Sequence, residues 1–210
     1  QLFDQSLTDN KQLSQILNDN YSNLLDQLLY KTYKDIQIQK EIGQILPYFA
    51  KFKQQTFIEK YMKTAFDYLF EKYEKLNLLV TLGKMVEVLG SPSYGFFQQI
   101  IICILQSIEP KKKQMDFSNE ALTCINTLAK AAPEQLSQHI KVLLDAMFIQ
   151  GLSPELVQAL SSVAENLSKI KAMGDIEERL FQLIDQELNG TNPMLINSPQ
   201  INIMSPKFIL

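Results

Sequence analysis

The 210-residue sequence is poor in the residues that build metal and redox sites: it has one histidine and two cysteines. His139 has no Cys, Asp or Glu at metal-ligand spacing on its own helical face, so we expect an exposed or rim histidine rather than a ligand. Cys103 and Cys124 lie in the apolar runs "IIICIL" and "LTCINTL". Two cysteines cannot support a disulfide framework. They are predicted to be free, buried thiols in a reducing compartment.

The seven glycines are dispersed and form no phosphate-binding loop of the GxGxxG or GxxxxGK[ST] type. No serine stands in a nucleophile-elbow context. The acidic run "DIEERL" is typical of a helix N-terminus, where carboxylates oppose the helix dipole, rather than of a catalytic carboxylate pair. The sequence therefore offers no active site, and we expect no catalytic residue, cofactor or metal.

Long apolar runs are also absent. No stretch approaches the roughly 20 apolar residues that span a membrane, and the first ten residues lack the pattern of a signal peptide. A formal charge of −3 and a pI of about 5.3 weigh against a nucleic-acid partner. Because the sequence begins with Gln rather than Met, we expect it to be a piece of a longer protein.

What the sequence does contain is a repeated helical stripe. Apolar residues at the i, i+3, i+4, i+7 spacing of a helix face occur four times, and the copies are separated by 40, 43 and 35 residues. The predicted core positions are Ile42, Ile45, Leu46, Phe49, Leu82, Met85, Val86, Leu89, Ile125, Leu128, Ala129, Ala132, Leu160, Val163, Ala164 and Leu167.

A second apolar helix follows each stripe, and helix-starting residues stand between the two. The second helices are expected at 56–73, 93–108, 134–149 and 175–188. Ser91-Pro92 and Ser153-Pro154 give two of the starts, Pro133 a third, and Asp175 with Glu178 has the spacing of a capping box. Nothing shows sustained strand alternation. Pairs of amphipathic helices with a period near 40 predict an all-α fold, an α-solenoid of antiparallel HEAT-type pairs.

The junction "GLSP" at 151–154 shows why one helix stops and another starts at once. Gly151 can close a helix in the left-handed conformation, Ser153 can cap the next one, and Pro154 fits its first position. The predicted pairs are 35–73, 75–109, 117–149 and 153–188, after a partial helical pair at 1–34. Pro47 is expected to kink the first helix of its pair.

Three features remain as candidates for contacts with other molecules. Lys111, Lys112 and Lys113 lie in a longer loop, "EPKKKQMDFS", and could bind phosphate, an anionic membrane surface or an acidic partner, or be a solvated loop. The aromatic residues between 57 and 73 cannot all face one side of a helix, so one or two could be exposed anchors. The segment 189–210 has three prolines and no helical period, which is typical of a linker or mobile loop.

Several collinear stretches resemble the N-terminal HEAT region of the target-of-rapamycin (TOR) kinases. They are "TCINTLAKAAPEQLSQHIKVLLDAMFIQGLSPELVQALSSVAENL" at 123–167, with its "GLSPEL" junction, "ILPYFAKFKQQTFIEKYMKTAFDYL" at 45–69, and "TLGKMVEVLGS" at 81–91. The resemblance covers roughly 40–188. Its motifs are structural, and their collinear order is what makes them specific.

The resemblance implies a segment of a very large serine/threonine protein kinase of the phosphatidylinositol-3-kinase-related class. In that family the kinase domain lies far toward the C-terminus, so no activity or catalytic residue is carried over to this chain. The family's N-terminal solenoid is a scaffold for the armadillo-containing companion subunit of TOR complex 1, and other parts of it receive an activating small GTPase. The parent would work in a dimeric, multi-subunit complex in the cytoplasm, recruited to the lysosomal or vacuolar membrane.

Two other classes of protein remain open at this point. A stand-alone HEAT adaptor, of the transport-receptor or phosphatase-scaffold kind, would have more repeats and a polar cap in place of a kinase domain. A helical-bundle enzyme or lipid binder would need an enclosed cavity with convergent polar groups.

Overall fold

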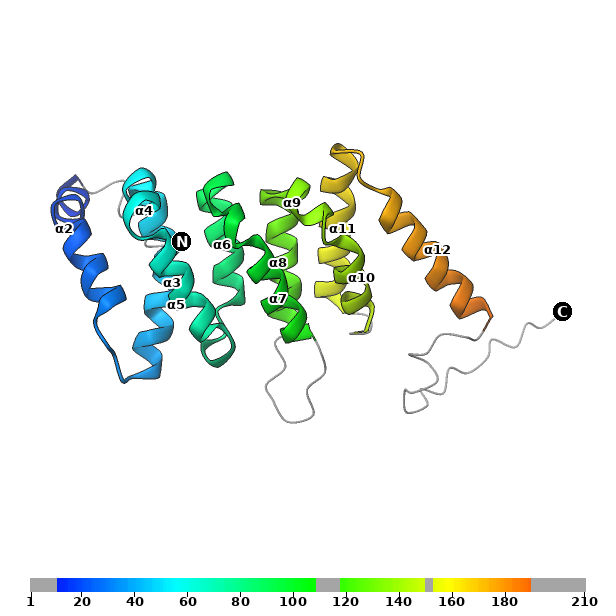
Figure 1. The fold of residues 1–210 in the computed structure, drawn as a ribbon, viewed down its shortest axis with the longest axis horizontal. Helices are drawn as coiled ribbons and strands as arrows, with labels where there is room; N and C mark the ends of the chain where they lie inside the picture. Colours follow the sequence, from blue (N-terminus) through cyan, green and yellow to red (C-terminus); the bar gives the residue numbers. More distant parts are fainter. Residues whose placement is uncertain (1–10, 109–117, 150–152, 190–210) are drawn as a thin grey trace.

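The computed structural model describes residues 11–108, 118–149 and 153–189, which form helices joined by short connections (Figure 1). The described part of the chain contains no strand, and none of its helices is long and apolar enough to cross a membrane. The elements are α2 (Lys11–Tyr30), α3 (Ile36–Phe52), α4 (Gln54–Lys60), α5 (Met62–Leu76), α6 (Leu79–Leu89), the 3-10 helix η1 (Ser91–Phe96), α7 (Phe97–Ile108), α8 (Ser118–Ala131), α9 (Pro133–Ser137), α10 (Ile140–Ile149), α11 (Pro154–Lys169) and α12 (Gly174–Leu188).

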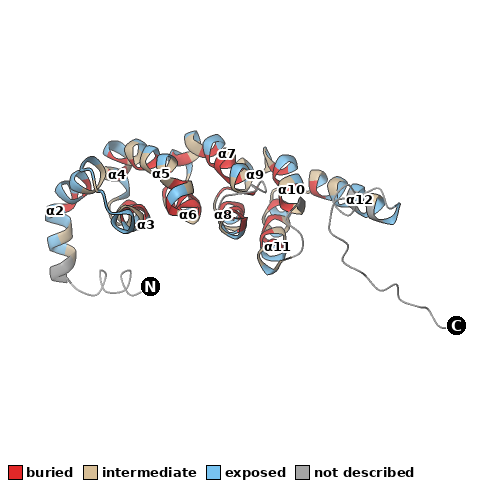
Figure 2. Cartoon of the chain, turned by 90° about the horizontal axis from the view of Figure 1, so that it is seen from below, coloured by how far each residue is buried: buried red, intermediate tan, exposed pale blue. Residues whose placement is uncertain are grey.

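The helices stack in two rows, as seen from below in Figure 2. The inner row contains α3, α6, α8 and α11, each packed on the next. The outer row contains α4, α5, α7, α9, α10 and α12, and the stack curves with the inner row on its concave side. This arrangement confirms the predicted all-α solenoid of helix pairs.

Small residues let the inner helices approach closely. A β-carbon built on Gly83 of α6 would lie 3.2 Å from Cys124 Sγ and 3.3 Å from Thr127 Cβ of α8. Between α8 and α11, the Ser162 hydroxyl reaches the Asn126 carbonyl at 3.4 Å. Residues with little or no side chain permit this separation, because larger ones would fill the space between the helix backbones.

The predicted core stripes line this inner row. Twelve of the predicted positions are at most 3% exposed: Ile42, Leu46, Leu82, Met85, Val86, Leu89, Ile125, Leu128, Ala129, Ala132, Val163 and Leu167. Ile45, Phe49, Leu160 and Ala164 are half-buried. Both cysteines are free and buried, as predicted.

Helix starts differ between the two Ser-Pro sites. At 153–154, Ser153 has an extended backbone and its side chain accepts from the Leu156 N–H at 3.1 Å, as predicted. Ser91-Pro92 also starts a helix, as predicted, but it is a 3-10 helix and Ser91 is not its N-cap. There Gly90 takes φ +64° and precedes a 3-10 helix, so the α-helix begins only at Phe97. Gly151 lies outside the described residues.

Pro47 lies inside α3 and is buried, without ending that helix. The predicted helix at 56–73 is divided into α4 and α5 at Tyr61, yet the i→i−4 hydrogen bonds continue across the division. The Tyr61 N–H donates to the Phe57 carbonyl and the Ala65 N–H to the Tyr61 carbonyl, both at 2.8 Å. The two segments therefore act as one long outer helix.

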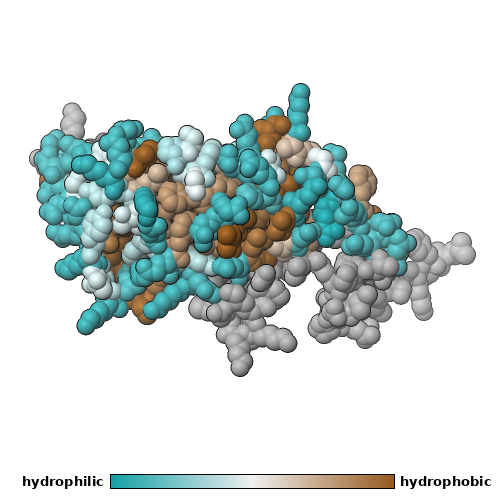
Figure 3. Space-filling view, viewed as in Figure 1, coloured by the Kyte–Doolittle hydropathy of each residue, from teal (hydrophilic) through white to brown (hydrophobic). Residues whose placement is uncertain are grey.

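The outer face carries a hydrophobic area over α7 and α10, surrounded by hydrophilic side chains (Figure 3). Both helices are apolar around most of their circumference, in "FQQIIICILQSI" and "IKVLLDAMFI". A helix of this kind is normally covered on all sides. The outward side of α10 is only partly covered, since Val142 is 55% exposed.

Candidate interaction face

The described residues contain no group of three or more His, Cys, Asp and Glu side chains that could hold a metal ion. Burial raises the pKa of the Cys103 thiol to about 11 and that of Cys124 to about 12. Thiols with such pKa values are poor nucleophiles at neutral pH. Neither buried cysteine is therefore suited to act as a nucleophile at neutral pH.

A hollow of about 550 Å³ opens on the inner row between α3, α6 and α8. Lining residues on α3 and on α6 recur at a spacing of four, as in Lys40 and Gln44 or Val80 and Lys84, so each of these helices contributes one face to the hollow. Half-buried Ile45 and Val80 give it an apolar part. The lining residues are Lys40, Gln44, Ile45, Tyr48, Asn77, Val80, Thr81, Lys84 and Glu120.

Asn77 and Glu120 both line this hollow and are bonded to each other. Asn77 ends α5 in the left-handed conformation, with φ 55° and ψ 59°, which asparagine tolerates better than most residues. Its Nδ2 donates to Glu120 Oε1, in the first turn of α8, at 2.8 Å. This bond fixes the orientation of the carboxamide and leaves Asn77 Oδ1 buried without a hydrogen-bond partner.

Three further polar groups of the hollow have no partner among the described residues. Neither Lys40 nor Lys84 forms an ion pair with a described residue. Lysines elsewhere on the surface do form such pairs, among them Lys63, Lys141 and Lys169. The hydroxyl of Thr81, a residue only 6% exposed, forms no hydrogen bond. Lys84 is exposed and Lys40 half-buried, and Asn77 Oδ1 is the fully buried atom among these groups. The convergence of two unpaired lysines, the Thr81 hydroxyl and this amide oxygen on one hollow marks it as a candidate binding site.

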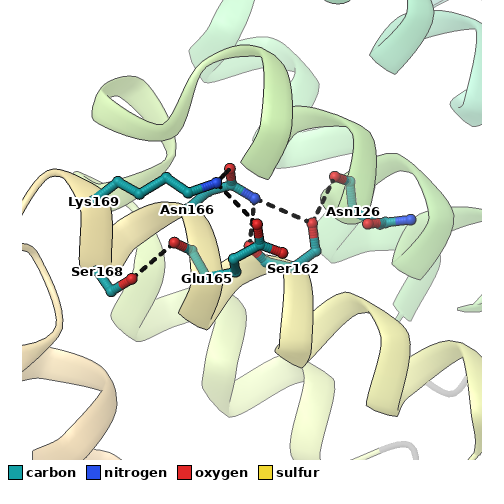
Figure 4. Close-up of polar contacts among 6 residues, drawn as sticks. All are labelled: Asn126, Ser162, Glu165, Asn166, Ser168 and Lys169. Atoms are coloured by element: carbon teal, nitrogen blue, oxygen red, sulfur yellow. Dashed lines mark hydrogen bonds and ion pairs between the residues drawn. The ribbon is translucent and has the colours of Figure 1, made fainter.

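A second polar cluster lies on the inner row where α11 packs on α8 (Figure 4). Asn166 Nδ2 donates to the Ser162 carbonyl at 2.8 Å, and Lys169 Nζ donates to Glu165 Oε1 at 2.9 Å. The hydrogen bond and charge of Lys169, with Lys130 of α8 adding to the charge, lower the pKa of Glu165. Asn126 Oδ1 is buried there without a partner. The inner row thus presents polar, mixed-charge groups along its length.

Charged side chains form ion pairs between the last helix and α10. Lys141 of α10 pairs with Asp175 at 3.1 Å and with Glu178 at 4.0 Å, and Arg179 pairs with Asp145. These residues line a groove of about 380 Å³ between α10 and α12. Because α12 begins at Gly174, Asp175 lies within its first turn, so the predicted capping role of Asp175 was wrong.

The other predicted contact residues are placed as follows. Lys111, Lys112 and Lys113 lie outside the described residues. His139 is half-buried, and its ring stacks on Phe97 with centroids 6.1 Å apart. Of the aromatic residues between 57 and 73, Phe57, Tyr61, Phe66 and Tyr73 are buried and Tyr68 and Phe70 are half-buried, so none is an exposed anchor.

Sequence reasoning missed the hollow. Its lysines, threonine and glutamate come from three different helices and form no motif along the chain. Asn77 carried the one usable signal, because an asparagine between two apolar helical patterns is a common helix C-terminus in the left-handed conformation.

Comparison with known proteins finds relatives in one family. Over 166 residues, 77% of the chain, it is 31% identical to a serine/threonine-protein kinase TOR of Oryza sativa subsp. japonica. It is 27% identical over 184 residues (83%) to mTor of Drosophila melanogaster, and 25% identical over 182 residues (84%) to tor1 of Schizosaccharomyces pombe. The chain is homologous to a segment of TOR-family proteins.

The TOR relatives are far longer than this chain, which spans 7% of the rice and fly proteins and 8% of the fission-yeast protein. No protein-family model and no solved structure matches the chain. The matches to TOR proteins confirm the resemblance drawn from the collinear helical stretches.

Proposed function

We propose that this chain is a non-catalytic scaffold segment of a TOR-type serine/threonine kinase, and that its inner row presents a binding surface for another protein of the TOR complex. The proposed parent protein is the kinase, with its catalytic domain outside these residues. The observation that carries the proposal is the inner row itself, where unpartnered polar groups and a hollow lie on a concave stack of helices.

The shape of the chain supports a binding role. A solenoid exposes a long curved surface, and its neighbouring repeats keep that surface in a fixed geometry. The apolar stripes are used in packing the rows together, and the polar residues of α3, α6, α8 and α11 remain available to solvent. Such a surface suits recognition of a partner more than chemistry on a small substrate.

For the partner, we propose the armadillo-containing companion subunit of TOR complex 1, in a dimeric cytoplasmic complex that is recruited to the lysosomal or vacuolar membrane. The test compares the full-length parent protein with a version that lacks residues 40–188. Both are purified from cells through a tag, and the companion subunit in each eluate is quantified.

The expected result is loss of the companion subunit from the deleted version, with phosphorylation of a generic serine/threonine peptide retained. Retained activity is the control, because it shows that the kinase domain still folds. Equal recovery of the companion subunit with both versions would rule this segment out as its binding site.

A further inference from the structure

We propose that the hollow between α3, α6 and α8 binds an extended acidic peptide segment of a protein partner, with the peptide's carboxylates at Lys40 and Lys84. This inference rests on the proposed function, in that the ligand is a protein, and it adds the site and the chemistry of the contact. It is carried by the polar groups that line the hollow and lack partners.

The two lysines supply the charge. Lys40 is on α3 and Lys84 on α6, so an anion between them would also connect two repeats. Neither forms an ion pair with the described residues, so neither has to break a contact before it binds. Hydrogen bonds between an ammonium group and a carboxylate are stronger than those between neutral groups.

Thr81 supplies a second, independent observation. The residue is 6% exposed and lines the hollow, and its hydroxyl forms no hydrogen bond with the described residues. A peptide backbone offers both N–H donors and carbonyl acceptors, and a hydroxyl can bond to either of them. A bound peptide could therefore bond to a hydroxyl that no described residue uses.

The remaining walls favour a peptide over a phosphate. Ile45 and Val80 give apolar surface that fits an aliphatic side chain next to an acidic one. Glu120 stands in the wall, and its negative charge opposes a doubly charged phosphate more than a single carboxylate. Two lysines also fall short of the basic clusters that bind phosphoinositides.

The probe is a phage-displayed library of random dodecapeptides, selected on the purified chain. Selected peptides are then synthesised with a fluorophore, and their affinity is measured by anisotropy. The site variants are the double substitution Lys40→Met with Lys84→Met, and the nearly isosteric Thr81→Val. The matched control is Lys60→Met with Lys75→Met, which removes the same charge from exposed positions on α4 and α5. Thermal unfolding shows that each variant folds.

We expect peptides in which Asp or Glu flanks an aliphatic residue, and a loss of affinity of about tenfold or more in the lysine double variant, because charged hydrogen bonds are removed. Thr81→Val should weaken binding by a smaller factor, and the control variant should bind like the unmodified chain. The peptide assignment would be overturned if inorganic phosphate or inositol hexakisphosphate displaced the peptide from the unmodified chain at concentrations that leave the fold of the chain unchanged. Selection of non-acidic peptides, equal binding by the lysine double variant, or no enrichment at all would also overturn it.

The failure of this inference can be told apart from failure of the proposed function. If the full-length parent carrying Lys40→Met and Lys84→Met keeps its companion subunit, whereas deletion of 40–188 releases it, the hollow is not the contact but the segment is. If the deletion has no effect, the proposed function itself fails.

Discussion

Gly83 of α6 faces Cys124 of α8 so closely that a β-carbon on Gly83 would lie 3.2 Å from the cysteine sulfur and 3.5 Å from its carbonyl oxygen. Contact at this distance leaves no room for a longer side chain. The separation of α6 and α8 is therefore set by a glycine, and the inner surface of the solenoid depends on it.

Replacing Gly83 by leucine should destabilise the chain although leucine is the better helix former. Overpacking of a close interface costs about 1–3 kcal/mol of the free energy of unfolding. The measurement is urea unfolding followed by circular dichroism. Gly95→Leu is the control, because a β-carbon at Gly95 meets nothing within 4 Å. Equal midpoints for the two variants would show that the helices are not held at this separation.

Tyr21 attaches α2 to the rest of the stack. It is 1% exposed, and its hydroxyl donates to the Phe49 carbonyl of α3 at 2.7 Å. Tyr21→Phe should lower the free energy of unfolding by about 1 kcal/mol, the usual net value of a hydrogen bond. Tyr30→Phe is the matched control, since Tyr30 is 62% exposed, and it should change stability by less than about 0.5 kcal/mol. The same loss in both variants would contradict a specific role for the buried bond.

Stability should fall at alkaline pH because of the buried thiols. The pKa of Cys124 is raised from 9.0 to about 12 by burial, so above pH 9 the unfolded chain releases a proton that the folded chain keeps. The free energy of unfolding should be constant below pH 9 from this cause and decline as pH rises from 9 toward 12. Cys103, raised to about 11, acts in the same direction.

Urea unfolding at several pH values between 7 and 11 measures this slope. Cys124→Ala should give a shallower decline above pH 9, whatever its effect on stability at neutral pH. A slope unchanged by the substitution would assign the alkaline loss to other groups, such as Tyr73, whose pKa burial raises to about 12.

The charged contacts between α10 and α12 should make that joint sensitive to salt. Lys141 and its acidic partners are well exposed, so added salt screens them. Lys141→Met and Arg179→Met together should speed amide hydrogen exchange in 174–188, and high salt should do the same in the unmodified chain. Lys63→Met, which breaks an exposed pair within α5, is the control. Unchanged exchange in the double variant would mean that apolar contacts such as buried Ile176 hold α12.

The rows of the fold could be predicted from the sequence, whereas the hollow could not. Stripes such as Leu82, Met85 and Val86 report a helix face directly, because helical periodicity is written in consecutive residues. Lys40, Thr81 and Glu120 meet only after three helices have stacked. Their meeting depends on helix separations set by residues such as Gly83, which carry no periodic signal.

The start of an α-helix could be predicted only where a side chain caps it without help from an unusual backbone conformation. Ser153 caps α11 as expected from its position before Pro154. At Ser91-Pro92, Gly90 takes φ +64° and a 3-10 helix precedes the α-helix. Both sites have the sequence Ser-Pro, so this difference cannot be predicted from that dipeptide.

Cross-linking of the intact parent assembly tests the central claim most directly. Inner-row helices carry Lys40, Lys84, Lys130 and Lys169, and outer-row helices carry Lys60, Lys63, Lys75 and Lys141, so one lysine-reactive reagent samples both faces. A scaffold that binds its partner on the inner row predicts cross-links from the inner lysines to another polypeptide, with the outer lysines linking mainly within the chain. Inner lysines that link only to their own chain, while the outer lysines reach other subunits, would contradict it.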